Sequence, residues 1–182
     1  MSAKDELTGA VLDHLLSGAG GEGLDRSLRA LAGAIGVGHS LLLYHFGSRD
    51  GLLAAVHEEC ERRERAHLAA FGAEDADART TMHRMWRHLA EPRMWPVYRL
   101  GFALRARRPA GADAVREPWI DELLPLVRAM GVPGAGARAE ALLWLATCRG
   151  LLFELVTGAD PLAVDAAAEA FFAHYSGAPQ TR

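Results

Sequence analysis

The sequence predicts an all-α protein, and three observations support this class. Alanine and leucine are the most frequent residues, and no stretch shows the strict alternation of apolar and polar residues that marks a half-buried strand. Apolar residues instead recur at helical spacing. Prolines stand at the edges of the apolar segments, where they end or begin helices without breaking them. These prolines are Pro92, Pro96, Pro109, Pro133 and Pro161.

Four helices are predicted in the first part of the chain, over residues 5–17, 28–35, 39–45 and 49–71. The first carries an apolar stripe at helical spacing and ends in a glycine-rich stretch. Ser27 and Ser48 are placed to cap the second and fourth helices. The glycines at 36 and 38 make the turn between the second and third helices.

Five more helices are predicted after the polar segment GAEDADART at residues 72–80. They cover residues 80–90, 96–107, 114–130, 135–157 and 161–175. Asp160 precedes Pro161, which is the typical order of a helix N-cap and a first-turn proline.

The composition indicates the cellular compartment in which the protein is expected. Two cysteines in 182 residues, Cys60 and Cys148, cannot form a disulfide framework and suit a reducing cytoplasm. The first residues lack the apolar segment of a secretory signal. Glu140, Arg149 and Glu154 interrupt the most apolar stretch, so no membrane span is expected. We therefore expect a cytoplasmic protein.

Motif composition argues against an enzyme. The chain contains no phosphate-binding glycine loop, no GxSxG, no HExxH and no CxxC motif, and no cofactor is predicted. His57, Cys60, Glu64 and His67 fall on one face of the fourth helix, and their types could bind zinc. The rise along seven residues is about 10 Å, too far for all four to reach one ion. A packing face is the favoured interpretation, and no metal site is predicted.

Residues 28–46 satisfy the requirements of a helix-turn-helix. Ala32 provides the small residue where two helices cross, and Gly36 provides the turn. Val37 fills the core beneath the turn, and Leu42 and Phe46 anchor the second helix from the same side. The outward side then carries His39, Ser40, Leu41, Tyr44 and part of His45. In a helix-turn-helix this side faces the major groove of DNA.

The segment SLRALAGAIGVGHSLLLYHFGSRDGLLAAV resembles the DNA-binding domain of the TetR family of bacterial transcriptional regulators. The resemblance covers about residues 5–60. It implies a three-helix DNA-binding domain at residues 1–48 and a ligand-binding and dimerisation domain at residues 49–182. It also implies a homodimer on pseudo-palindromic, double-stranded operator DNA, most often a repressor released by a small molecule.

The DNA-binding residues expected from the motif and the resemblance form one set. They are Ser27, Arg29, Gly38, His39, Ser40, Leu41, Tyr44, His45 and Arg49. Ser27 serves equally as a plain helix cap, and His45 either packs between helices or contacts a phosphate. Leu43 stands where the family usually has a tyrosine, so that phosphate contact is lost or Tyr44 makes it.

The charge of the first 60 residues limits how the expected DNA-binding surface can bind DNA. Residues 1–60 hold four basic and eight acidic residues, which argues against non-specific coating of DNA but allows a small, locally positive contact surface. DNA affinity should rest on few phosphate contacts.

All four tryptophans lie in the second part of the chain, where they form either an ordinary core or the wall of a ligand cavity. The cavity implied by the resemblance would bind an apolar or aromatic effector. Its expected residues are Met82, Trp86, Trp95, Tyr98, Arg99, Phe102, Trp119, Leu123, Trp144 and Cys148. An inward-pointing Arg99 would favour a carboxylate or phenolate ligand, and an outward-pointing one a neutral hydrophobe.

The last two predicted helices resemble the family's dimer interface. The eighth helix is apolar nearly all round, and the ninth supplies small alanines that permit close approach. The expected interface residues are Leu142, Leu145, Phe153, Ala163, Ala167 and Phe171. The alternative function is a helical module that binds small molecules or proteins but not DNA; it would leave His39, Ser40 and Tyr44 unexplained.

Overall fold

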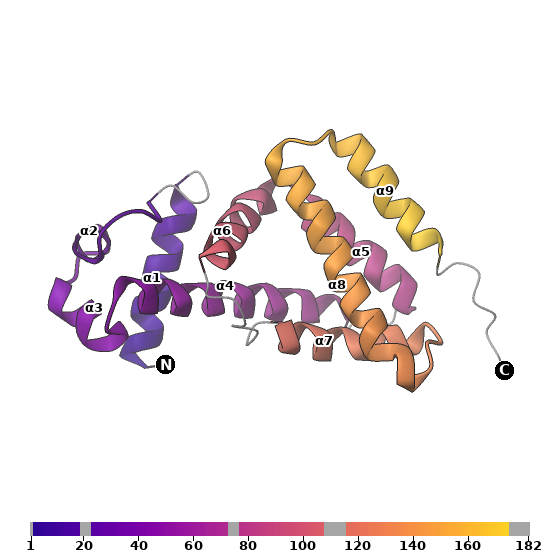
Figure 1. The fold of residues 1–182 in the computed structure, drawn as a ribbon, viewed down its shortest axis with the longest axis horizontal. Helices are drawn as coiled ribbons and strands as arrows, with labels where there is room; N and C mark the ends of the chain where they lie inside the picture. Colours follow the sequence, from indigo (N-terminus) through magenta and orange to yellow (C-terminus); the bar gives the residue numbers. More distant parts are fainter. Residues whose placement is uncertain (1, 19–22, 73–76, 108–115, 175–182) are drawn as a thin grey trace. The chain divides into compact units, whose positions relative to one another are not determined.

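A computed structural model describes residues 2–18, 23–72, 77–107 and 116–174 of the chain. Over these ranges the protein is built from α-helices and one 3₁₀ helix, with no strand, which confirms the predicted class (Figure 1). The helices are α1 (Ala3–Ser17), α2 (Leu28–Ala34), α3 (His39–Phe46), α4 (Arg49–Gly72), α5 (Ala78–Ala90), η1 (Pro92–Met94), α6 (Trp95–Ala106), α7 (Arg116–Ala129), α8 (Gly134–Thr157) and α9 (Pro161–Ala173). The ends expected at residues 114 and 175 lie outside the described residues.

The described residues form two compact units. The first unit is drawn from residues 1–64 and 96–112, and the second from residues 65–95 and 113–182. Helix α4 contributes its first two-thirds to one unit and its last turns to the other.

The first unit has a single apolar core made by α1, α2, α3, α4 and α6. Leu12, Leu31, Leu42 and Val56 are at most 1% exposed in this core, and Leu100 of α6 is fully buried in it. The unit therefore extends well past residue 48, because α6 supplies part of the core that holds the first three helices.

Local signals explain the helix-turn-helix. The Ser27 hydroxyl accepts a hydrogen bond from the Ala30 amide at 3.2 Å and caps α2. Gly36 has φ +73°, a conformation that favours glycine, and the next amide, that of Val37, donates to the Ala32 carbonyl at 2.9 Å. Gly51 is also required, since a Cβ there would lie 2.2 Å from the Phe46 carbonyl oxygen. The turn and the close approach of α3 to α4 both depend on missing side chains.

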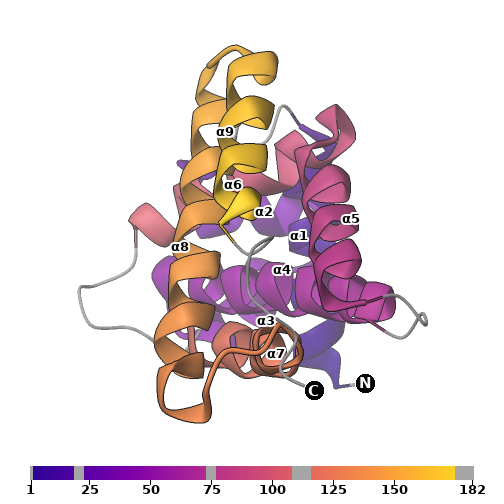
Figure 2. The same ribbon diagram turned by 90° about the vertical axis from the view of Figure 1, so that its right-hand side faces the viewer.

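The second unit is a helical bundle in which α8 packs against α7 and α9, and α5 packs against α7 and α8. Figure 2 shows α8 and α9 running side by side, as their contacts also indicate. Between them the rings of Trp144 and Phe172 stack with centroids 5.0 Å apart. Asp160 caps α9 through the Leu162 amide, with Pro161 in the first turn. No helix in the described part of the chain is long and apolar enough to cross a membrane.

Candidate functional site

Helix α3 buries one side and exposes the other. Leu42 is fully buried, whereas Tyr44 is 84% exposed and Leu41 is 41% exposed. Ser40 is exposed and His39 is half-buried. Ser40, Leu41 and Tyr44 therefore share the outward side of one helix, and His39 stands half-buried at its first position.

The remaining residues of α3 have mixed surroundings. His45 is half-buried, and its ring lies edge-on to the ring of Tyr44, with centroids 5.1 Å apart. Gly38 begins the helix without a side-chain cap, which leaves the first amides of α3 to other partners. Leu43, outside the expected set, is 45% exposed on a different side of the helix from Leu41.

Arg49 has a structural role that the sequence did not reveal. Its guanidinium donates to the Arg26 carbonyl at 2.9 Å and also to the Leu24 carbonyl. The carboxylates of Asp25 and Asp50 lie 3.9 Å and 3.6 Å away. Arg49 therefore ties the start of α4 to the segment before α2. Its side chain stays about one-third exposed, so a donor can still reach a phosphate.

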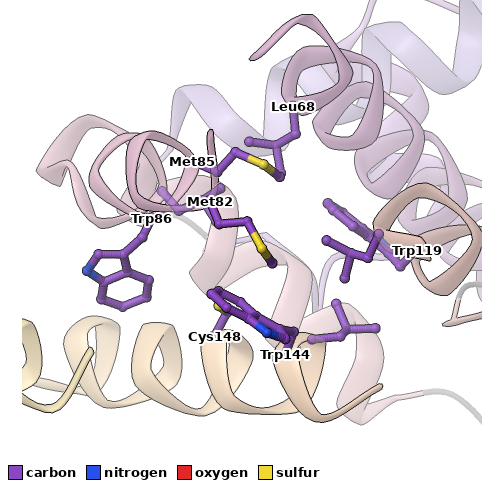
Figure 3. Close-up of a pocket in the computed structure, with 10 residues that line it drawn as sticks. Leu68, Met82, Met85, Trp86, Trp119, Trp144 and Cys148 are labelled. Carbon is purple, nitrogen blue, oxygen red and sulfur yellow. The ribbon is translucent and has the colours of Figure 1, made fainter. Parts of the chain in front are cut away.

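The second unit contains an apolar pocket (Figure 3). Its empty volume is about 410 Å³, which includes open solvent. In Figure 3 the side chains of Met82 and Met85 reach from α5 toward this space, and Trp119 and Trp144 enter from α7 and α8. The lining residues are Leu68, Met82, Met85, Trp86, Leu89, Trp119, Leu123, Trp144, Leu145 and Cys148.

Six of the ten expected ligand residues line this pocket: Met82, Trp86, Trp119, Leu123, Trp144 and Cys148. Trp95 does not line it, and its indole nitrogen donates to the Ala90 carbonyl at 3.1 Å. Tyr98, Arg99 and Phe102 belong to the first unit and are absent from the lining. Arg99 is exposed. The sequence reasoning missed Leu68, Met85, Leu89 and Leu145.

The pocket lining carries no charge. All ten lining side chains are apolar, apart from the thiol of Cys148 and the indole nitrogens. Burial raises the pKa of the Cys148 thiol to about 12, so this group stays neutral near pH 7. The guanidinium carbons of Arg65 and Arg149 lie 5.9 Å and 5.5 Å from the Trp119 ring centroid.

Helices α8 and α9 expose several apolar side chains on the surface of the single chain. Leu142 is 41% and Phe153 48% exposed on α8, and Ala163 and Ala167 are exposed on α9. Two other expected interface residues are less exposed. Phe171 is half-buried, and its ring centroid lies 4.8 Å from that of Trp144. Leu145 is buried on the side of α8 that lines the pocket. Leu143 and Leu162 are also exposed but were not expected.

A metal centre finds no support in the described ranges, where no group of three His, Cys, Asp or Glu side chains could hold an ion. His57 and Cys60 are buried on α4. Burial raises the pKa of the Cys60 thiol to about 12, so this group stays neutral near pH 7.

The fold has close counterparts among solved structures. A candidate transcriptional regulator from Rhodococcus sp. RHA1 is 15% identical, covers 99% of this chain and 98% of its own, and has a TM-score of 0.76. A TetR-family transcriptional regulator from Pectobacterium atrosepticum is 20% identical, covers 94% of this chain and 92% of its own, and has a TM-score of 0.69. BioQ, solved with its natural double-stranded DNA operator, is 21% identical, covers 96% of this chain and 100% of its own, and has a TM-score of 0.60. No protein-family model and no curated protein sequence matches the chain. The chain therefore has the fold of the TetR-family regulators over nearly its full length.

Proposed function

We propose that this chain, which shares the TetR-family fold, is a DNA-binding transcriptional regulator that acts in the cytoplasm as a ligand-responsive, homodimeric repressor. One observation carries the proposal: a helix-turn-helix whose second helix turns Tyr44 and its neighbours outward, in a fold also adopted by operator-bound BioQ. An interaction module without DNA-binding activity would not need this exposed face.

In the proposed complex α3 lies in the major groove of double-stranded DNA. Ser40, Leu41 and Tyr44 face base edges from its exposed side, and His39 reaches them from the first position of the helix. The expected backbone-contacting residues are Ser27, Arg29, Gly38, His45 and Arg49. Arg49 can hold its carbonyl partners and a phosphate together, because a guanidinium has five donors.

The proposed dimer forms through α8 and α9. Their exposed apolar side chains, Leu142, Phe153, Ala163 and Ala167, would be covered by the same surface of a second chain. Leu145 faces the pocket and is left out of this interface, while Leu143 extends it. Leu162 is exposed on the side of α9 that carries Asp165 and is also left out. Two-fold symmetry of the dimer requires a pseudo-palindromic operator.

The proposed effector is a neutral apolar or aromatic molecule in the pocket of the second unit. No lining residue is a cation, and Arg99 is exposed and does not line the pocket. The guanidiniums of Arg65 and Arg149 lie against the Trp119 ring, but neither residue belongs to the lining. A buried anion without a partner would be costly. Met82 and Met85 adapt to irregular shapes and make favourable contacts with aromatic rings. Release of DNA then follows if the effector binds better to a conformation in which the recognition helices no longer match the operator.

Fluorescence anisotropy with duplex DNA from beside the gene tests the regulator proposal. We expect tighter binding to one pseudo-palindromic fragment than to a scrambled duplex of the same composition. Tyr44→Ala and His39→Ala should weaken that binding by about 1–3 kcal/mol per lost base contact. Equal binding to both duplexes by the unmodified chain would instead support the interaction module.

A further inference from the structure

The outward side of α3 lacks the side chains that usually read base pairs by paired hydrogen bonds. Guanine is typically bound by Arg or Lys, adenine by Asn or Gln, and cytosine by Asp or Glu. None of these residue types occurs in the eight residues His39–Phe46. Base reading by this helix must therefore depend on other chemistry.

Two of the exposed groups on α3 are apolar and adjacent. Leu41 and Tyr44 are three residues apart, which places them side by side on a helix. They are 41% and 84% exposed, in contrast to the fully buried Leu42 between them in the sequence. Covering exposed apolar surface of this kind with a partner lowers the free energy of the complex. In the major groove the apolar feature of a base edge is the 5-methyl group of thymine.

We propose that Leu41 and the ring of Tyr44 recognise thymine methyl groups in each half of the operator. This inference rests on the proposed function, in which α3 enters the major groove. Ser40 lies beside the two apolar groups, next to Leu41 in sequence and one turn before Tyr44, and His39 stands at the first position of the same helix. Each of the two polar side chains can supply single hydrogen bonds. The half-site is then specified chiefly by where its thymines lie.

Replacing thymine by uracil tests this directly, because uracil lacks only the methyl group. Duplexes enriched by the full-length protein from a random pool would be resynthesised with one dT→dU change at a time, and Kd measured at one salt concentration. We expect at least one position per half-site where the change weakens binding about fourfold, the value for one buried methyl group. The symmetric pair of changes should weaken binding about 16-fold, since each half-site loses the same contact.

Leu41 and Leu43 provide a matched pair of variants. Both are leucines on α3 with similar exposure, 41% and 45%, but they are two residues apart and so point to nearly opposite sides. Leu41→Ala should weaken binding to the thymine duplex and abolish the uracil effect at one position, a coupling that a double-mutant cycle measures. Leu43→Ala should keep the full uracil effect.

The outcomes separate the inference from the function on which it rests. Tight, specific binding with every uracil change within twofold would overturn methyl recognition and leave the regulator proposal intact. An uracil effect that survives equally in Leu41→Ala and Tyr44→Ala would also overturn it. If no duplex is enriched over a scrambled one, DNA binding itself fails and the inference falls with it.

Discussion

Arg105 on α6 donates a hydrogen bond of 2.8 Å to the Oε1 atom of Glu61, a carboxylate on α4 whose side chain is only 8% exposed. The Nε2 atom of His57 lies 3.4 Å from the same oxygen. A buried carboxylate is costly to leave without its cation. This contact therefore fixes α6 to the helix that follows the helix-turn-helix, within the first unit.

Arg105→Met should lower the free energy of unfolding by about 1–3 kcal/mol in chemical denaturation, less than for a fully enclosed pair because Arg105 is 37% exposed. The double variant Glu61→Gln/Arg105→Met should lose less than the two single changes combined. Arg62→Met is the matched control on α4, since the Arg62–Glu59 pair is mostly exposed on the arginine side. It should cost under about 1 kcal/mol. Equal losses in both arginine variants would contradict a special role for the buried pair.

Arg49 should affect stability and DNA binding by separate routes. Arg49→Ala and Arg49→Lys both remove the paired bonds to the carbonyls of Leu24 and Arg26, and each should lower stability by about 1–2 kcal/mol. If Arg49 also meets a phosphate, Arg49→Ala should flatten the slope of log K against log salt by about one per subunit. Arg49→Lys, which keeps the charge, should not. An unchanged slope in Arg49→Ala would show that Arg49 acts only by holding the segment before α2 to the start of α4.

Dimerisation should fail when a charged residue is placed in the seam, the exposed apolar surface formed by Leu142 and Phe153 of α8 and Ala163 and Ala167 of α9. Ala167→Glu and Phe153→Asp each place a carboxylate at a symmetric contact, where it is buried without a partner. Light scattering should then report a single chain's mass, with helicity retained and operator affinity lost. Asp165→Ala, an exposed position on another side of α9, should remain dimeric. A dimer that survives both seam variants would place the interface elsewhere. Phe171 is unsuitable for this test because it packs against Trp144.

Local sequence signals predicted the positions of the helices well. The features that these signals could not predict depend on long-range packing. Ser27, Gly36 and Asp160 act through neighbours in the sequence, so caps and turns could be located from the sequence alone. Trp95 and Tyr98 have the same aromatic character as the pocket tryptophans, but the Trp95 indole donates to the Ala90 carbonyl and Tyr98 belongs to the first unit. Periodicity gives a helix an apolar face without saying which neighbour covers it.

Helix α8 shows the same limit on one element. It is apolar nearly all round, so its spacing could not separate Leu142, which is exposed, from Leu145, which lines the pocket. Arg49 gave no local sign of its carbonyl partners, which precede it by more than twenty residues.

The pocket should bind a neutral aromatic molecule and reject its charged analogue. 1-Methoxynaphthalene and 1-naphthoate share a ring system, and the naphthoate should bind at least about tenfold more weakly because the lining offers its carboxylate no partner. Binding should change tryptophan emission through Trp86, Trp119 and Trp144, which line the pocket. Replacing these three singly by Phe should reduce the signal. Trp95→Phe should leave it intact, since Trp95 lies outside the lining.

Neutral ligand should also weaken operator binding, and operator should weaken ligand binding by the same factor, as thermodynamic linkage requires. Titrating each partner in the presence of the other measures both factors. Preferred binding of the naphthoate would mean that a cation reaches the pocket, and an emission change that persists in all three pocket variants would place the ligand elsewhere. Either result would overturn the assignment of this pocket to a neutral effector, while the exposed face of α3 and its proposed role on DNA would stand.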